Sequence, residues 1–92
     1  MIIKFSAEWC LNCKLLTKYL NIKNIITEDI DYDDDISKVE LYNIKKLPTL
    51  IILNNDIEID RFEGYSEKRN NELYNFLEKN NIIKKLEISE NF

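Results

Sequence analysis

The sequence predicts a single α/β domain with a four-stranded mixed sheet and about three helices. The beginning of the chain reads strand, helix, strand, a unit that places both strands parallel in one sheet. Further along, two strand-like runs flank the turn-forming residues 54–56, which is typical of an antiparallel hairpin. The 92 residues suffice for one modest core and leave no room for a second domain.

Hydrophobic patterning predicts the first three elements. Residues 2–6 form an apolar run of strand length, and residues 11–20 have helical spacing. One face of that helix is expected to be buried, with Leu11, Leu15 and Tyr19 on it. The β-branched run 25–31 predicts the second strand.

The middle of the chain predicts a second helix and the hairpin. Acidic residues 33–35 suit the start of a helix, although a solvated acidic turn fits the first two aspartates equally well. The inward stripe of this helix would comprise Ile36, Val39 and Tyr42. Residues 49–53 and 57–62 predict the two hairpin strands.

A final helix is predicted from Ser66, a good N-cap residue, to about Asn80. Its expected inward residues are Leu73, Phe76 and Leu77. Residues 82–92 fit three descriptions: a helical extension, a docked apolar segment or a frayed tail.

Composition and charge argue against several classes of protein. Hydrophobic residues make up 45% and charged residues 33% of the chain, as in ordinary globular proteins. The formal net charge is −4 and the lysines are scattered, so no nucleic-acid partner is expected. No apolar run approaches the roughly 20 residues of a membrane helix, and charge appears too early for a signal peptide. We therefore expect a cytoplasmic protein without membrane contact.

Two cysteines in the segment Trp9-Cys10-Leu11-Asn12-Cys13-Lys14 carry the chemistry. They follow the first strand and stand at the head of the first helix, where unpaired backbone N–H groups stabilise a thiolate. Cys10 is placed to attack a disulfide, and Cys13, one turn further, to resolve the mixed disulfide. With no histidine and no third cysteine, a tetrahedral zinc site lacks two preferred ligands, so no metal is expected.

The residues around these cysteines resemble the thioredoxin family. Ala7-Glu8-Trp9-Cys10 followed by Cys13-Lys14 is similar to the thioredoxin active-site segment. Leu47-Pro48-Thr49 resembles the segment that bears the family's cis-proline, and Gly64 falls where thioredoxins place a glycine near the substrate groove. A lone CxxC is weakly specific, but its combination with this proline and this glycine is a strong match.

The resemblance implies a thioredoxin-like fold that lacks the first strand and helix of a full thioredoxin. For that reason the strand 25–31 is expected at an open sheet edge, where its acidic residues discourage edge-to-edge pairing. The resemblance also implies a cis Leu47-Pro48 bond beside the dithiol, and a substrate-binding surface formed by Trp9, Leu47, Pro48 and Gly64. Three of these residues have a plainer explanation: Trp9 packing on the helix, a trans Pro48 opening a strand, and Gly64 ending one.

Two features depart from the family pattern. Leu11-Asn12 replaces the familiar Gly-Pro between the cysteines. Lys4 occupies the strand position of a buried family carboxylate, and Asp29 aligns with the matching family lysine. We expect a reversed ion pair in which Lys4 modulates the thiol pKa values, either as a cation that favours thiolate or as a neutral base for Cys13. A lysine that extends to solvent is the alternative.

The predicted function is thiol–disulfide oxidoreduction through a Cys10–Cys13 dithiol/disulfide couple. The expected partners are disulfide-bearing protein substrates and a separate reductant, with no bound cofactor. Two alternatives are a glutathione-dependent, glutaredoxin-like enzyme and a redox-inactive thioredoxin-fold binding module. Apolar groups left uncovered by the missing first helix suggest an interface with a partner or with a second copy of the chain, and we expect a monomer or a weak homodimer.

Overall fold

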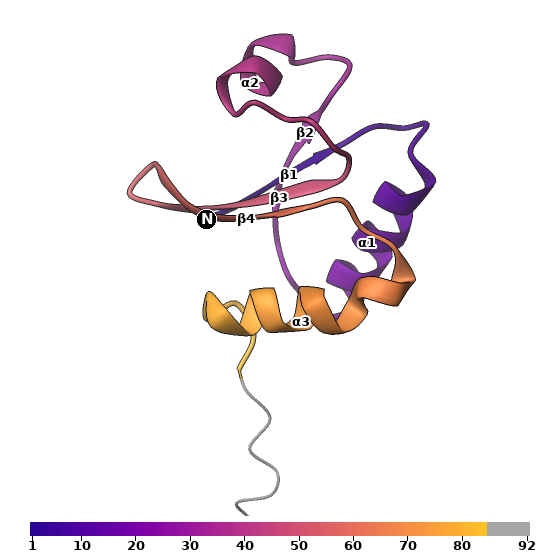
Figure 1. Cartoon of the computed structure of the whole chain (residues 1–92), viewed down its shortest axis with the longest axis vertical. Coiled ribbons are helices and arrows are strands. Elements are labelled where there is room, and N and C mark those ends of the chain that lie inside the picture. Colours follow the sequence, from indigo (N-terminus) through magenta and orange to yellow (C-terminus); the bar gives the residue numbers. More distant parts are fainter. Residues whose placement is uncertain (85–92) are drawn as a thin grey trace, which may run out of the picture.

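The computed structural model describes residues 1–84 and contains the predicted four-stranded mixed sheet (Figure 1). The strand order is β2-β1-β3-β4, with β1 parallel to β2 and antiparallel to β3, and β3 antiparallel to β4. The strands are β1 (Ile2–Ser6), β2 (Glu28–Asp31), β3 (Thr49–Asn54) and β4 (Ile57–Glu63). The helices are α1 (Leu11–Ile22), α2 (Ile36–Leu41), the short 3₁₀ helix η1 (Glu67–Arg69) and α3 (Asn70–Lys79). Within residues 1–84, no helix is long and apolar enough to cross a membrane.

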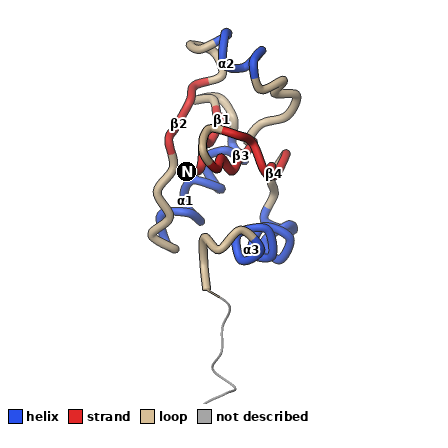
Figure 2. The backbone as a smooth tube through the Cα atoms, turned by 90° about the vertical axis from the view of Figure 1, so that its left-hand side faces the viewer, coloured by secondary structure: helices blue, strands red, loops and turns tan. Residues whose placement is uncertain are grey.

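Helices cover both faces of the sheet. α1 and α3 lie on one face and α2 lies on the other (Figure 2). Because successive strand side chains point to opposite faces, the central strand β3 contributes to two cores. Its Leu50 and Ile52 pack with α1 and α3, whereas Ile51 and Leu53 pack on the α2 side. Each such buried side chain stabilises the fold by about 1.5–3 kcal/mol, so the sheet is held from both sides.

The buried face of α1 is not the one predicted. The buried side chains are those of Cys13, Leu16 and Leu20. The prediction for Leu11 is wrong, since this residue is 70% exposed, while Leu15 and Tyr19 are partly buried at the margin of the core. The phase of the helix follows from Cys13, because residues three and seven positions after an inward cysteine share its face.

The second strand is shorter than predicted. Only Glu28–Asp31 pairs with β1. The pairing of the two strands begins with Ile3 opposite Glu28, close to the start of β1, so residues 25–27 lie outside the ladder. Ile25 still packs into the core shared by α1 and α3, whereas Ile26 is 90% exposed. As expected, β2 forms one edge of the sheet.

Helix α2 begins at Ile36, directly after the acidic run, whose first two aspartates lie in a turn. The carboxylate of its N-cap, Asp35, accepts a hydrogen bond from the Lys38 backbone N–H at 3.1 Å. Val39 and Tyr42 pack against the core on this face, as predicted. Ile36 does not, because it lines an open depression on the surface and is 63% exposed.

Helix α3 begins later than predicted. Ser66 is the N-cap of η1 and makes no side-chain capping bond, and α3 begins at Asn70. The 3₁₀ turn intervenes because the Arg69 N–H bonds to the Ser66 carbonyl at 2.9 Å. The inward residues of α3 are, as predicted, Leu73, Phe76 and Leu77. Ile82 is partly buried against the same core, whereas residues 85–92 of the predicted C-terminal segment lie outside the described residues.

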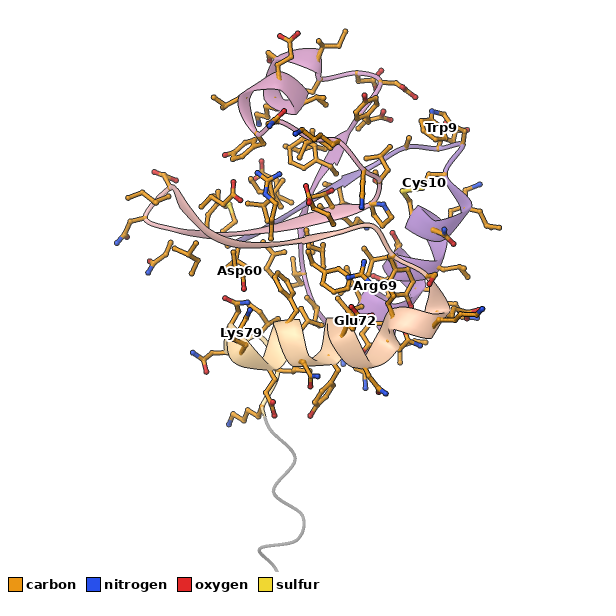
Figure 3. All side chains as sticks on the ribbon, in the orientation of Figure 1. Trp9, Cys10, Asp60, Arg69, Glu72 and Lys79 are labelled. Atoms are coloured by element: carbon orange, nitrogen blue, oxygen red, sulfur yellow. A yellow bond between two sulfur atoms is a disulfide. The ribbon has the colours of Figure 1, made fainter. Side chains whose placement is uncertain are left out.

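Asp60 ties β4 to the C-terminal end of α3. Its carboxylate accepts a hydrogen bond from Asn80 Nδ2 at 3.0 Å and pairs with Lys79 Nζ at 2.9 Å (Figure 3). Partial burial by itself raises the pKa of Asp60, but the hydrogen bonds from Asn80 and Lys79 outweigh it and leave the pKa below its ordinary value. These contacts fix α3 on the hairpin and so support the loop that joins them.

Candidate active site

The two cysteines stand at the junction of β1 and α1. Cys10 is the N-cap of α1 and has extended backbone, and Cys13 lies in the first turn of the helix. They form a disulfide, and their Cα atoms are 5.2 Å apart. The Cys13 backbone N–H donates a hydrogen bond to Cys10 Sγ at 3.1 Å. Because this N–H belongs to the unpaired donors at a helix N-terminus, the same bond stabilises a thiolate on Cys10 after reduction.

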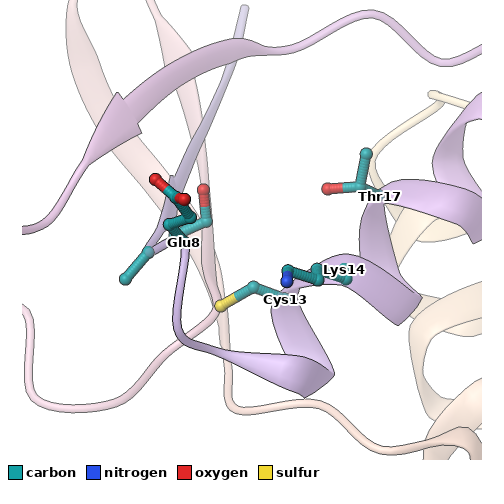
Figure 4. A pocket seen from close by; sticks show the side chains of 6 residues that line it. Glu8, Cys13, Lys14 and Thr17 are labelled. Carbon is teal, nitrogen blue, oxygen red and sulfur yellow. The ribbon is translucent and has the colours of Figure 1, made fainter.

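The two cysteines have different surroundings. Cys10 is 8% exposed and lines a groove of about 240 Å³ together with Trp9 and Leu47. Cys13 is 2% exposed and lines a separate cavity of about 200 Å³, in which Lys14 and Thr17 follow it along the same helix (Figure 4). Of the two cysteines, Cys10 is therefore the one that lines the groove.

Trp9 is held beside Cys10 by an acidic side chain. Its indole Nε1 donates a hydrogen bond to Asp33 Oδ2 at 2.7 Å. Figure 3 shows Trp9 and Cys10 together at one corner of the molecule. Trp9 is 67% exposed, which argues against the plainer explanation of packing on the helix and suits a contact surface. The role of Asp33 was not apparent in the sequence, where it is one of three consecutive aspartates.

The structure brings Leu47, Pro48 and Gly64 together near the disulfide. The Leu47-Pro48 peptide bond is cis, and Leu47 packs against the small cluster that Ala7, Cys10 and Cys13 form. The Gly64 N–H donates a hydrogen bond to the Pro48 carbonyl at 2.8 Å. Gly64 has φ +74°, a conformation that glycine adopts without steric cost. An added Cβ would meet only ordinary contacts, so the backbone angle rather than lack of space requires glycine here.

Arg69 supports this site and was not found by sequence reasoning. Its Nη1 donates hydrogen bonds to the carbonyl groups of Glu63 and Gly64, at 2.7 and 2.9 Å. The guanidinium also lies over the Phe62 ring, 4.3 Å from the centroid, and pairs with Glu72 (Figure 3). These contacts hold the loop that carries Gly64 in place. No motif contains Arg69, so the sequence carries no signal for them.

Lys4 and Asp29 meet across the ladder between β1 and β2, which pairs them directly. Lys4 Nζ lies 3.5 Å from Asp29 Oδ1 and donates a hydrogen bond to Thr17 Oγ1 at 2.6 Å. The side chain of Lys4 is 5% exposed and that of Asp29 is 61% exposed, so Lys4 does not extend to solvent. Thr17, four residues after Cys13, lines the same cavity as that cysteine. Thr17 therefore links the ammonium group of Lys4 to the Cys13 cavity. The i, i+4 spacing of Thr17 from Cys13 was the sequence signal that could have placed it there.

The Thioredoxin family model matches residues 1–79. This chain belongs to the thioredoxin family. Thioredoxins of Chlamydia caviae and Chlamydia trachomatis are 33% and 32% identical to it over 73 residues, which cover 74% of this chain and 72% of each relative. A structure of Plasmodium falciparum thioredoxin matches with a TM-score of 0.71 and 25% identity, covering 85% of this chain and 82% of that one. A solution structure of an oxidised thioredoxin from Plasmodium falciparum matches with a TM-score of 0.70 and 26% identity, covering 86% of this chain and 78% of that one.

This member of the thioredoxin family is a thiol–disulfide oxidoreductase with protein-disulfide reductase activity. The predictions of family, fold and reaction are thus confirmed. Its partners are, in general terms, disulfide-bearing substrates and a reductant. The Cys10–Cys13 pair supplies two sulfurs close enough to bond, which is what a two-electron exchange with a substrate disulfide requires. Within residues 1–84, no group of three or more histidine, cysteine or acidic side chains could hold a metal ion.

Proposed function

We propose that Cys10 is the attacking thiol of this member of the thioredoxin family and Cys13 the resolving thiol. The observation that carries the proposal is that Cys10 lines the groove and its sulfur accepts the hydrogen bond from the Cys13 N–H. Cys10, as a thiolate, attacks one sulfur of a substrate disulfide and displaces the other as a thiolate. Cys13 then loses its proton, attacks the Cys10 sulfur of the mixed disulfide and displaces the second substrate thiolate. The substrate gains two electrons and takes up two protons, and the Cys10–Cys13 disulfide remains.

In this proposal the substrate lies along Trp9, Leu47, Pro48 and Gly64. Trp9 and Leu47 line the groove with Cys10, which supports their contact with any group that reaches the sulfur. Gly64 is bonded to Pro48 and has no side chain to obstruct an extended peptide. Such a peptide can pair with the backbone of the proline segment, as in other cases of strand addition.

A separate reductant, either a reductase or a small thiol, completes the proposed cycle by returning Cys10–Cys13 to the dithiol. The protein then carries electrons from that reductant to protein disulfides. The reductant is needed because each turnover consumes two electrons from the dithiol pair, and these must be replaced before the next turnover.

We place this activity in the cytoplasm and assign it to a monomer or weak homodimer.

An insulin-reduction assay driven by dithiothreitol tests the proposed function. The protein is expected to accelerate the precipitation of reduced insulin chains clearly above the rate of dithiothreitol alone. A coupled assay with a glutathionylated peptide, glutathione and glutathione reductase is expected to stay at its blank rate. Activity in the coupled assay alone would favour the glutaredoxin-like alternative. Insulin reduction at the reagent rate would favour the redox-inactive binding module and overturn the proposal.

We extend the proposal to Lys4 and Asp29, which act on the thiols through charge. Lys4 is almost fully buried, and the carboxylate of Asp29 lies 3.5 Å from its Nζ. A buried cation behind Cys13 favours a thiolate there, because the interior screens charge less than water does. Lys4 is thereby a positioning residue that tunes the dithiol without touching the substrate.

The Lys4→Met variant tests this role. Loss of the ammonium is expected to raise the pKa of the Cys13 thiol and to lower the reduction potential of the dithiol by up to about 30 mV, equivalent to about 1.4 kcal/mol. Thiol pKa values are measured from alkylation rates against pH, and the potential from equilibration in glutathione buffers. Methionine has a similar length and is apolar, and the carboxylate that loses its partner, that of Asp29, is 61% exposed and stays solvated, so the fold is expected to survive.

The matched control is Lys14→Met, which removes the same charge from an exposed lysine that lines the Cys13 cavity. Its effect on both quantities is expected to be smaller, because water screens an exposed charge. Unchanged thiol pKa values in Lys4→Met would eliminate the electrostatic role. Slower release of the mixed disulfide at unchanged pKa values would instead identify Lys4 as a neutral base for Cys13.

A further inference from the structure

The groove beside Cys10 has a basic side that the sulfur chemistry does not use. Its lining consists of Trp9, Cys10, Tyr32, Lys45, Lys46 and Leu47. The two lysines immediately precede the Leu47-Pro48 segment, and both are exposed. The Lys46 side chain also approaches Gly64, since its Cδ lies 3.8 Å from the position that a Cβ of Gly64 would occupy. The basic side therefore connects the groove at Cys10 with the Gly64 loop.

Neither lysine has a counterion in the described part of the chain. Other basic side chains, such as Lys79 and Arg69, form ion pairs with carboxylates, whereas Lys45 and Lys46 form none among residues 1–84. The carboxylate of Asp33 is already engaged by the indole N–H of Trp9. An anionic group can therefore bind the two ammonium groups without breaking an internal ion pair.

The net charge of the whole chain is opposite in sign to the charge of Lys45 and Lys46. With a formal net charge of −4, the protein as a whole repels acidic partners. The two lysines without ion pairs in the groove instead attract a substrate carboxylate that lies close to Cys10. Salt screens this attraction only in part, because the Debye length is about 10 Å at 0.1 M salt. The side chains that line the groove thus carry a charge opposite in sign to the net charge of the chain.

We infer that this protein selects disulfides whose attacked cysteine has aspartate or glutamate next to it, with Lys45 and Lys46 as the specificity-determining residues. The inference rests on the proposed function, in which the sulfur attacked by Cys10 enters this groove. A substrate carboxylate placed beside that sulfur meets the lysine ammonium groups, while the rest of the peptide passes Trp9 and Leu47.

The experiment compares three short peptides that share one internal disulfide and differ only beside one cysteine, which carries two glutamates, two glutamines or two lysines. Pre-reduced protein is mixed with each peptide in single turnover, and the second-order rate constant is read from acid-quenched samples. The measured quantity is the ratio of the glutamate to the glutamine rate constant. Because both rates depend equally on the thiolate fraction of Cys10, this ratio is insensitive to any change in thiol pKa.

Wild type is expected to favour the glutamate peptide on the order of fivefold at low salt, as two exposed charge pairs allow. The Lys45→Gln/Lys46→Gln variant is expected to bring the ratio close to one, and Lys45→Glu/Lys46→Glu to invert it. The control Lys18→Gln/Lys23→Gln removes the same charge from exposed lysines further along and beyond α1. It is expected to keep most of the wild-type ratio.

A wild-type ratio of one, or an equal fall in the groove variant and the control, would overturn the inference. The first result would show no selection, and the second would assign it to net charge rather than to Lys45 and Lys46. Failure of the proposed function is distinguishable, because the glutamine peptide would then not be reduced at all. All substituted lysines are exposed and make no ion pair within residues 1–84, so the variants are expected to fold.

Discussion

The Cys10→Ser variant is expected to lose insulin reduction by at least about a thousandfold, down to the rate of the reagent alone. A serine hydroxyl stays protonated near neutral pH, so the groove loses the anion that attacks the substrate sulfur. Cys13, at 2% exposure and on the wall of a separate cavity, is not placed to replace it. The measurement is the steady-state turbidity assay, with circular dichroism to confirm that the variant is folded.

Cys13→Ser is the matched variant that separates attack from resolution. Cys10 can still form the mixed disulfide with a substrate, but no second thiol is present to release it. A covalent adduct is therefore expected to accumulate, visible as a mass increase under non-reducing conditions and removed by dithiothreitol. Adduct formation by Cys10→Ser instead of Cys13→Ser would show that the order of attack is the reverse of the one proposed.

Leu16→Ala is expected to lower the free energy of unfolding by about 3 kcal/mol, within the usual range for a buried leucine. Leu16 is 0% exposed and packs in the core between α1, α3 and the sheet, so its truncation leaves a cavity there. A domain of this size is stable by only about 5–15 kcal/mol, so the loss is a large part of the total. Urea denaturation of the oxidised protein measures it.

Leu11→Ala provides a control on the same helix with the same chemical change. Leu11 is 70% exposed, and its truncation is expected to cost less than about 0.5 kcal/mol. Equal destabilisation by the two variants would contradict the face of α1 that the structure buries. The pair also compares the predicted helix face with the observed one, because hydrophobic patterning had assigned Leu11 to the buried side.

Part of the candidate site could be predicted because its signals are local. Cys10 and Cys13 follow a strand and open a helix, and both facts are contained in a few consecutive residues. The pairing of Lys4 with Asp29 was also predictable, but through the resemblance to the thioredoxin family, and the observed register joins these residues. Leu73, Phe76 and Leu77 were placed correctly because helical spacing leaves one choice of apolar face.

Other contacts could not be predicted because they join segments that are far apart in the sequence. Asp33 bonds to Trp9 across 24 positions, and Thr17 bonds to Lys4 across 13. The residues next to a threonine or an aspartate in the sequence do not predict which distant group its side chain will contact. The same holds for Lys46, whose approach to Gly64 depends on how two loops lie at the end of the sheet.

By itself, the amino-acid sequence determined the fold class, the order of the elements and the redox pair, because each of these is specified by spacing along the chain. Only the tertiary structure decided which face of α1 is buried, how short β2 is, and which side chains surround Cys10. The physical reason is that these features depend on where the sheet, the helices and the loops meet. The energy of burial, and not local propensity, selects among alternatives that the sequence pattern leaves equal.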